Sequence, residues 1–229
     1  MQKVYYNRMK TAQRRTSLLF LAVVYLAAAN ALAAPQQPPA SKPITTSSLD
    51  SHEGLTIAAD PWLSAERYKQ AFAKKSPYTS GILAVKMTIR NDSGESIKLG
   101  IDRIRLNLTL DETNRQDLPP LTSEQVADAV LHPHPKTSSR FPVPIPVPSS
   151  GGGGRDKNWQ QYQKLAEDAA LRAGVVAPHS TVEGLLYFDL QGQFEMLSNA
   201  RLYIPDLLAL EKNQALMYFD IDLSRPGAR

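Results

Sequence analysis

The chain has 229 residues and no cysteine, which excludes cysteine nucleophiles, thiolate zinc sites, iron–sulfur clusters and a lipidated cysteine anchor. Its 26 basic residues exceed its 22 acidic residues, but five of the bases precede Ala33. The remainder therefore carries 21 bases against 22 acids, and this near-neutral balance argues against a nucleic-acid-binding protein.

The first 33 residues contain the three parts of a secretory signal peptide. Residues 1–17 carry five basic and no acidic side chains, an apolar run begins at Leu18, and Ala31-Leu32-Ala33 is a small-x-small ending. The run is short for a membrane span, which needs about 20 apolar residues. We therefore expect cleavage after Ala33 and export to a periplasm or outside the cell, with an uncleaved membrane anchor as the alternative.

The remainder divides into a linker and one domain. Residues 34–51 are rich in Pro, Gln, Ser and Thr, a composition typical of a disordered linker. Residues 52–229 are long enough for one domain, which must rely on a hydrophobic core because no disulfide can form. We expect a mainly β fold, an antiparallel immunoglobulin-like β-sandwich with short helices and a Pro/Gly-rich insertion at about 119–174.

Hydrophobic periodicity predicts the elements of the first half. They are a strand near 54–58, a helix over 62–73 that begins at Asp60-Pro61, and strands over 81–90, 96–101 and 103–110. The strand over 81–90 gives the clearest pattern, because Leu83, Val85, Met87 and Ile89 alternate with polar residues. Residues 111–116 are predicted to be a polar turn.

The second half predicts two helices followed by strands. The helices cover about 122–131, after a capping signature at Thr122, and 157–173, where Gly174 would close the helix. The strands cover 182–190, 200–204 and 216–223. In the last strand, alternation predicts Met217, Phe219, Ile221 and Leu223 on the buried face.

Three segments together resemble exported bacterial immunoglobulin-like domains of unknown function. They are residues 84–92 with Asn91 after the strand, Ala177-Pro178 followed by the strand over 184–188, and the closing strand over 216–223. The resemblance implies an envelope-associated β-sandwich. Such domains share no reaction, so it implies no catalytic residue.

The insertion contains a run in which prolines alternate with apolar residues. Phe141, Val143, Ile145 and Val147 are each followed by proline, and residues 151–154 are all glycine. Alternating prolines favour polyproline II, which loses little entropy when it docks into a partner's groove. These four residues are the candidate contact with an envelope protein or the membrane surface; the alternative is a plain spacer.

Histidines and paired carboxylates provide the only candidate chemistry. His132 and His134 stand two residues apart with His179 distant, and Asp220 and Asp222 share one strand face with Asp189 as a third carboxylate. A metal site or acid–base pair could use such groups, but a solvated strand face has the same pattern. We expect no metal, cofactor or enzymatic activity. The alternative is a hydrolase or small-ligand-binding protein, which a polar pocket joining His132 or His179 to Asp220 would favour.

Overall fold

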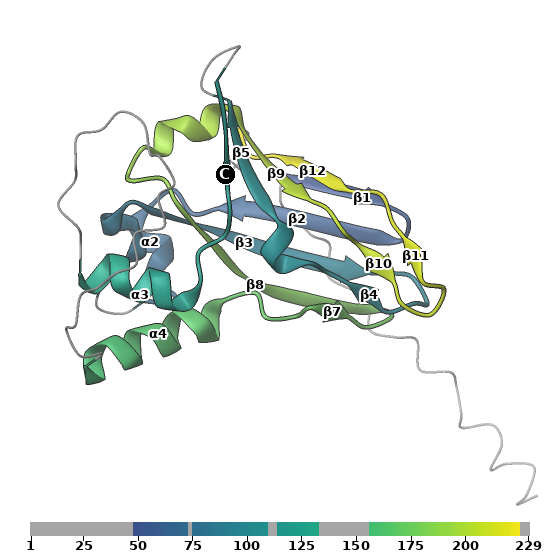
Figure 1. Cartoon of the computed structure of the whole chain (residues 1–229), viewed down its shortest axis with the longest axis horizontal. Helices are drawn as coiled ribbons and strands as arrows, with labels where there is room; N and C mark the ends of the chain where they lie inside the picture. Colours follow the sequence, from purple (N-terminus) through teal and green to yellow (C-terminus); the bar gives the residue numbers. More distant parts are fainter. Residues whose placement is uncertain (1–47, 73–74, 110–113, 133–155, 225–229) are drawn as a thin grey trace, which may run out of the picture. The chain divides into compact units, whose positions relative to one another are not determined.

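The computed structural model describes residues 48–72, 75–109, 114–132 and 156–224, all within one compact unit of residues 44–229 (Figure 1). Their regular structure is mainly antiparallel β-sheet, with a few short helices. The predicted signal peptide, most of the predicted linker, His134 and the candidate contact residues Phe141, Val143, Ile145 and Val147 lie outside the described residues.

The first sheet has the strand order β1-β2-β3-β8. Its strands are β1 (Leu49–His52), β2 (Leu55–Pro61), β3 (Ile82–Asn91) and β8 (Ser180–Asp189). Glu53 and Gly54 join β1 to β2 with φ angles of 51° and 76°, the two positive values that a type I′ hairpin turn needs. Strand β1 therefore covers residues that the sequence assigned to the linker ending at 51.

A second sheet has the order β12-β9-β5-β6. Its strands are β12 (Phe219–Asp222), β9 (Ala200–Ile204), β5 (Arg105–Thr109) and β6 (Arg115–Leu118). Strand β6 includes Arg115 and Gln116, the last two residues of the predicted polar turn, whose residues 111–113 lie outside the described residues. It has no apolar alternation, because it is an edge strand whose Arg115 and Asp117 are exposed.

Short strands and 3-10 turns complete the described β structure. The third sheet pairs β11 (Gln214–Ala215), β10 (Leu208–Ala209), β4 (Ile97–Lys98) and β7 (Val175–Val176). The 3-10 turns are η1 (Pro77–Ser80), η2 (Ile101–Arg103) and η3 (Phe194–Asn199).

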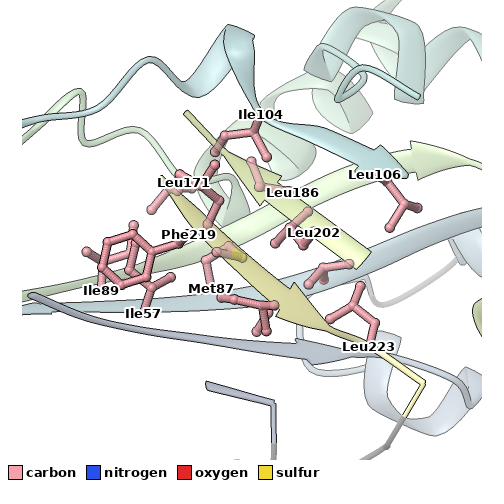
Figure 2. Close-up of a cluster of buried hydrophobic side chains, with 14 of the residues drawn as sticks. Ile57, Met87, Ile89, Ile104, Leu106, Leu171, Leu186, Leu202, Phe219 and Leu223 are labelled. Atoms are coloured by element: carbon pink, nitrogen blue, oxygen red, sulfur yellow. The ribbon is translucent and has the colours of Figure 1, made fainter. Parts of the chain in front are cut away.

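The main hydrophobic core is built by the first two sheets together. Ile57 and Met87 of the first sheet and Phe219 of the second belong to one buried cluster, and Figure 2 shows their side chains gathered among the strands. Leu83, Val85, Met87 and Ile89 are all buried in it, which confirms the apolar face predicted for β3. In β12, Phe219, Ile221 and Leu223 are buried, but Met217 is 62% exposed and precedes the strand, so its predicted inward position was wrong.

A second hydrophobic cluster covers the opposite face of β3 at one end. Ile82 and Ala84 of β3 are buried there against helices α3 (Ser123–Leu131) and α4 (Lys157–Ala169). Figure 1 shows these helices gathered with α2 (Ala65–Tyr68) at one end of the first sheet. The first half of β3 is therefore buried on both faces, whereas the sequence pattern had predicted one solvent face.

A helix start predicted from local sequence is found in the structure only where those residues are not paired into a sheet. Thr122 forms the predicted capping box with Gln125, and α3 begins next to it. Asp60 and Pro61 also look like a helix start, but they pair with Lys86 and Val85 of β3. The predicted helix over 62–73 is therefore reduced to the single turn α2.

Helix α4 ends earlier than predicted because the chain turns to join β8. The helix stops at Ala169 rather than near Gly174, and Ala170 forms an isolated parallel bridge with Leu185. The Leu171 N–H donates to the Leu185 carbonyl at 3.0 Å. A Cβ at Gly184 would lie 2.8 Å from the Ala170 carbonyl carbon and closer still to Leu171. Only glycine at 184 permits this contact.

Asn91 joins three parts of the fold through its side chain. It is fully buried, its Nδ2 donates to the Glu95 and Ala177 carbonyls at 2.6 and 3.1 Å, and its Oδ1 accepts from the Ser93 N–H at 3.0 Å. Asn91, which the sequence placed just after the strand over 81–90, is therefore the last residue of β3 and has a structural role.

Substituting Gly184 should destabilise the fold through this close contact. We expect Gly184→Ala to lower the free energy of unfolding by about 1–3 kcal/mol, because the added methyl group displaces backbone. Gly174→Ala is the matched control, since a Cβ at Gly174 meets no atom within 4 Å. Urea unfolding of both variants measures the effect, and equal stability of the two would contradict the assignment.

Candidate functional site

A pocket of about 440 Å³ lies among the helices at this end of the first sheet. Its described lining residues come from the segment after α2, the end of α3, and α4 from its N-cap to Leu165. They are Phe72, Lys75, Leu131, His132, Asp156, Asn158, Gln161, Tyr162 and Leu165. We call this site the helical pocket.

Helix α4 forms one wall of the helical pocket because it is amphipathic. Trp159, Tyr162 and Ala166 are buried in the second cluster, while the polar residues Asn158 and Gln161 line the pocket beside Tyr162. Positions three or four residues apart lie on the same helix face, so Asn158, Gln161 and Leu165 follow one another along the pocket. Leu165 is 45% exposed there.

The other walls are fixed to α4 by aromatic side chains. The Phe72 and Tyr162 rings stack at a centroid distance of 5.7 Å and an interplanar angle of 24°. The Tyr162 hydroxyl donates to the Lys75 carbonyl at 3.0 Å, and Trp159 Nε1 donates to Asp128 Oδ1 of α3 at 2.6 Å. The pocket is therefore framed by α3, α4 and a loop tied to them.

Two further tyrosines hold the helical end onto the sheet. The Tyr187 hydroxyl donates to the Ala166 carbonyl of α4 at 3.0 Å. The Tyr68 hydroxyl donates to the Ile82 carbonyl at 3.0 Å and accepts from the Ala84 N–H at 2.7 Å. Burial raises the pKa of Tyr68, Tyr162 and Tyr187, since the phenolate would be desolvated. These phenols stay neutral and serve as structural donors.

The polar residues that line the helical pocket include both hydrogen-bond donors and acceptors. Lys75 carries an ammonium group, which only donates, and the side-chain amides of Asn158 and Gln161 can donate and accept. Asp156 is the N-cap of α4, and its Oδ1 accepts the Trp159 N–H at 2.8 Å. Phe72, Leu131 and Leu165 supply apolar surface. This combination suits a ligand that offers an apolar body and hydrogen-bond acceptors.

The structure separates most of the residues that the sequence had grouped as candidate chemistry. His132 lines the helical pocket, whereas His179 is exposed near the start of β8 with a φ of 52°. Asp220 lies in β12, where its Oδ1 accepts from Arg201 Nε at 2.8 Å. The described lining of the helical pocket includes His132 and Asp156 but neither His179 nor Asp220, so it is not the pocket that would favour the hydrolase alternative.

The remaining carboxylates are engaged by neighbouring backbone. Asp189 Oδ1 accepts the Gln191 N–H at 2.8 Å, and Asp222 Oδ1 accepts the Ser224 N–H at 2.9 Å. Within the described ranges, no group of three His, Asp or Glu side chains could hold a metal ion. The same ranges contain no helix that is both long and apolar enough to cross a membrane.

Sequence reasoning missed Phe72, Lys75 and Leu165 as pocket residues. Leu165 had been placed in the apolar stripe of α4, but it lies at the edge of that stripe and remains exposed. An apolar residue at the edge of an otherwise buried stripe is the one sequence signal that could have indicated a contact surface. Lys75 and Phe72 are brought to α4 only by tertiary packing.

Comparison with known proteins adds a distant structural similarity. No protein-family model and no curated protein matches this chain. Among solved structures, the chain is similar to a functionally unknown protein from Listeria monocytogenes EGD-e, with 12% sequence identity and a TM-score of 0.35. The similarity covers 78% of this chain and 82% of that protein, and at this score it supports no statement about function.

The buried Tyr187 hydroxyl predicts a pH-dependent loss of stability. Its pKa is raised in the folded chain from an ordinary value near 10, so its contribution is complete below pH 10 and declines above it. At pH 8, Tyr187→Phe should cost about 1 kcal/mol through the lost hydrogen bond to Ala166. At pH 11, ionisation of Tyr187 in the unfolded wild type costs about 1.4 kcal/mol and should cancel that difference. Urea unfolding at both pH values measures it; a constant difference would contradict the assignment.

Proposed function

We propose that this chain is an exported, non-enzymatic binding module of the bacterial cell envelope, with a β-sandwich as its scaffold. The signal-like sequence of residues 1–33 supports export. The core shared by the two sheets supports the β-sandwich. The observation that carries the binding role is the helical pocket, a cavity with exposed apolar surface and several hydrogen-bond donors.

The proposal does not depend on an immunoglobulin-like strand order. Immunoglobulin constant-type domains pair their strands as A-B-E-D and C-F-G, so that strands distant in sequence meet in each sheet. The described strands pair as β1-β2-β3-β8 and β12-β9-β5-β6, and the first three strands of the first sheet are consecutive. The scaffold argument needs only two facing sheets.

The helical pocket has the properties expected of a binding site. Its volume lies within the range of about 300–1,000 Å³ that is usual for ligand sites. Its walls belong to helices and to a loop that Tyr162 fastens to α4, so the site is largely formed before a ligand arrives. Preformed walls reduce the entropy cost of binding.

Phe141, Val143, Ile145 and Val147 remain the proposed contact with an envelope partner. They follow His132 in the chain, and His132 lines the helical pocket. We name residues 141–148 the proline arm. The proposal assigns to one end of the molecule both the helical pocket and the attachment of the proline arm.

A second candidate is the binding of a small ligand in the helical pocket. Lys75, Asn158 and Gln161 favour it, because their donors could orient a ligand that carries acceptor groups.

A further alternative is that the same module stays tethered by an uncleaved N-terminal anchor. The mass of the mature protein distinguishes cleavage after Ala33 from this anchor.

The binding role predicts that partner capture depends on the helical end. In-cell crosslinking followed by pull-down of the tagged protein should recover an envelope protein, and replacing residues 141–154 by a Gly/Ser linker should abolish its recovery. Leu165→Glu, which places a charge in the helical pocket, should reduce recovery at least tenfold.

Leu210→Glu is the control for the charge itself, because Leu210 is 40% exposed and does not line the helical pocket. We expect normal recovery and an unchanged melting temperature for this variant. Equal recovery with Leu165→Glu and Leu210→Glu would contradict a binding site at the helical pocket.

A further inference from the structure

Both ends of one segment of the chain meet at the helical pocket. His132 and Asp156 stand on either side of residues 133–155, and both line the pocket. The intervening 23 residues therefore begin and end there, whatever path they take. The proline arm lies in the middle of this segment.

The proline arm is within reach of the helical pocket from both sides. Phe141 is nine residues after His132, and Pro148 is eight residues before Asp156. An extended chain spans about 3.3–3.6 Å per residue, so each flank can extend for more than 25 Å or so and can fold back. Chain length permits residues 141–148 to lie in the pocket.

The helical pocket presents the groups that a proline-rich segment needs. Polyproline II segments dock on aromatic-lined grooves, and the stacked Phe72 and Tyr162 rings, although 2% and 7% exposed, form part of the pocket wall. Prolines lack an N–H, so the proline arm offers mainly carbonyl acceptors. Asn158 and Gln161 supply side-chain donors that match them.

The apolar side of the helical pocket also matches the proline arm. Leu165 is 45% exposed and lines the pocket with Leu131, although Trp159, Tyr162 and Ala166 of the same apolar stripe are buried. Covering such a side chain removes apolar area from water, which stabilises the docked arrangement. Phe141, Val143, Ile145 and Val147 are side chains that could cover it.

We propose that the proline arm docks in the helical pocket of its own chain when no partner is bound. This inference rests on the proposed function, in which the same residues contact an envelope partner. A bound partner then occupies the helical pocket in place of the proline arm and contacts the released arm, so capture needs both an intact pocket and release of the arm from it.

Because the proline arm belongs to the same chain as the pocket, even a weak affinity between them would give a high occupancy of the pocket. A short flexible connection gives an effective concentration in the millimolar range. If the free segment bound with a dissociation constant of about 0.1 mM, the attached arm would occupy the pocket roughly ten times more often than not. An added copy of the segment should then bind the intact chain about tenfold more weakly than a chain without its own arm.

A labelled peptide tests this competition directly. The probe is a fluorescein-labelled peptide of residues 139–150, and its binding is measured by fluorescence anisotropy. The arm-free protein is the full chain with Phe141, Val143, Ile145 and Val147 all changed to serine; a second version replaces residues 136–153 by a Gly/Ser linker of the same length. We expect the peptide to bind both arm-free versions and to bind the wild type at least tenfold more weakly.

Pocket variants locate the bound peptide. Leu165→Glu in the arm-free chain should abolish peptide binding, whereas Leu210→Glu should leave it unchanged. Equal binding to the wild type and the arm-free chain, no binding to either arm-free version, or binding that survives Leu165→Glu would each overturn the inference.

The experiment separates this inference from the proposed function. Recovery of an envelope partner by a chain that binds no peptide would overturn the docking inference alone. Competitive peptide binding by a chain that recovers no envelope partner would support docking and count against the proposed function.

Discussion

The helical end of the molecule depends on one close approach of two backbones. Gly184 of β8 has no side chain, and this allows residues 170–171 to lie against the strand directly after α4 ends. The Leu171 N–H then bonds to the Leu185 carbonyl, and the Tyr187 hydroxyl bonds to the Ala166 carbonyl one turn earlier. These contacts fix the end of α4, and α4 in turn supports α3 through Trp159. The helical pocket exists because this chain of contacts holds its walls in place.

The helices that frame the proposed site also cover apolar surface of the first sheet, so they contribute to the stability of the fold. The first half of β3 is buried on both faces, with Leu83 in the main core and Ile82 in the second cluster. Removing the helices would therefore expose apolar sheet surface and not only open a pocket. The fold itself therefore holds the walls of the helical pocket in place.

The sequence predicted the elements whose local pattern agrees with their tertiary partners. The alternation over 81–90 and the capping box at Thr122 appear in the structure as expected. The helix predicted to begin at Asp60-Pro61 was wrong because strand pairing with β3 outweighed a local helix signal. Strand β6 was missed because a polar edge strand has no apolar period. The helical pocket could not be predicted, since its lining comes from three separate segments whose meeting no local pattern encodes. Its only sequence signal is Leu165 at the edge of an apolar stripe.

The most direct test of contact at the helical end is site-specific photocrosslinking in cells. A photoreactive residue at position 165 should form adducts, either with an envelope protein or with residues 136–155 of the same chain. The same residue at position 210, which is similarly exposed but does not line the pocket, should form neither. Mass spectrometry of the adducts identifies the contacts. No adduct at position 165, or the same adducts at both positions, would contradict the assignment of the helical pocket as the binding site.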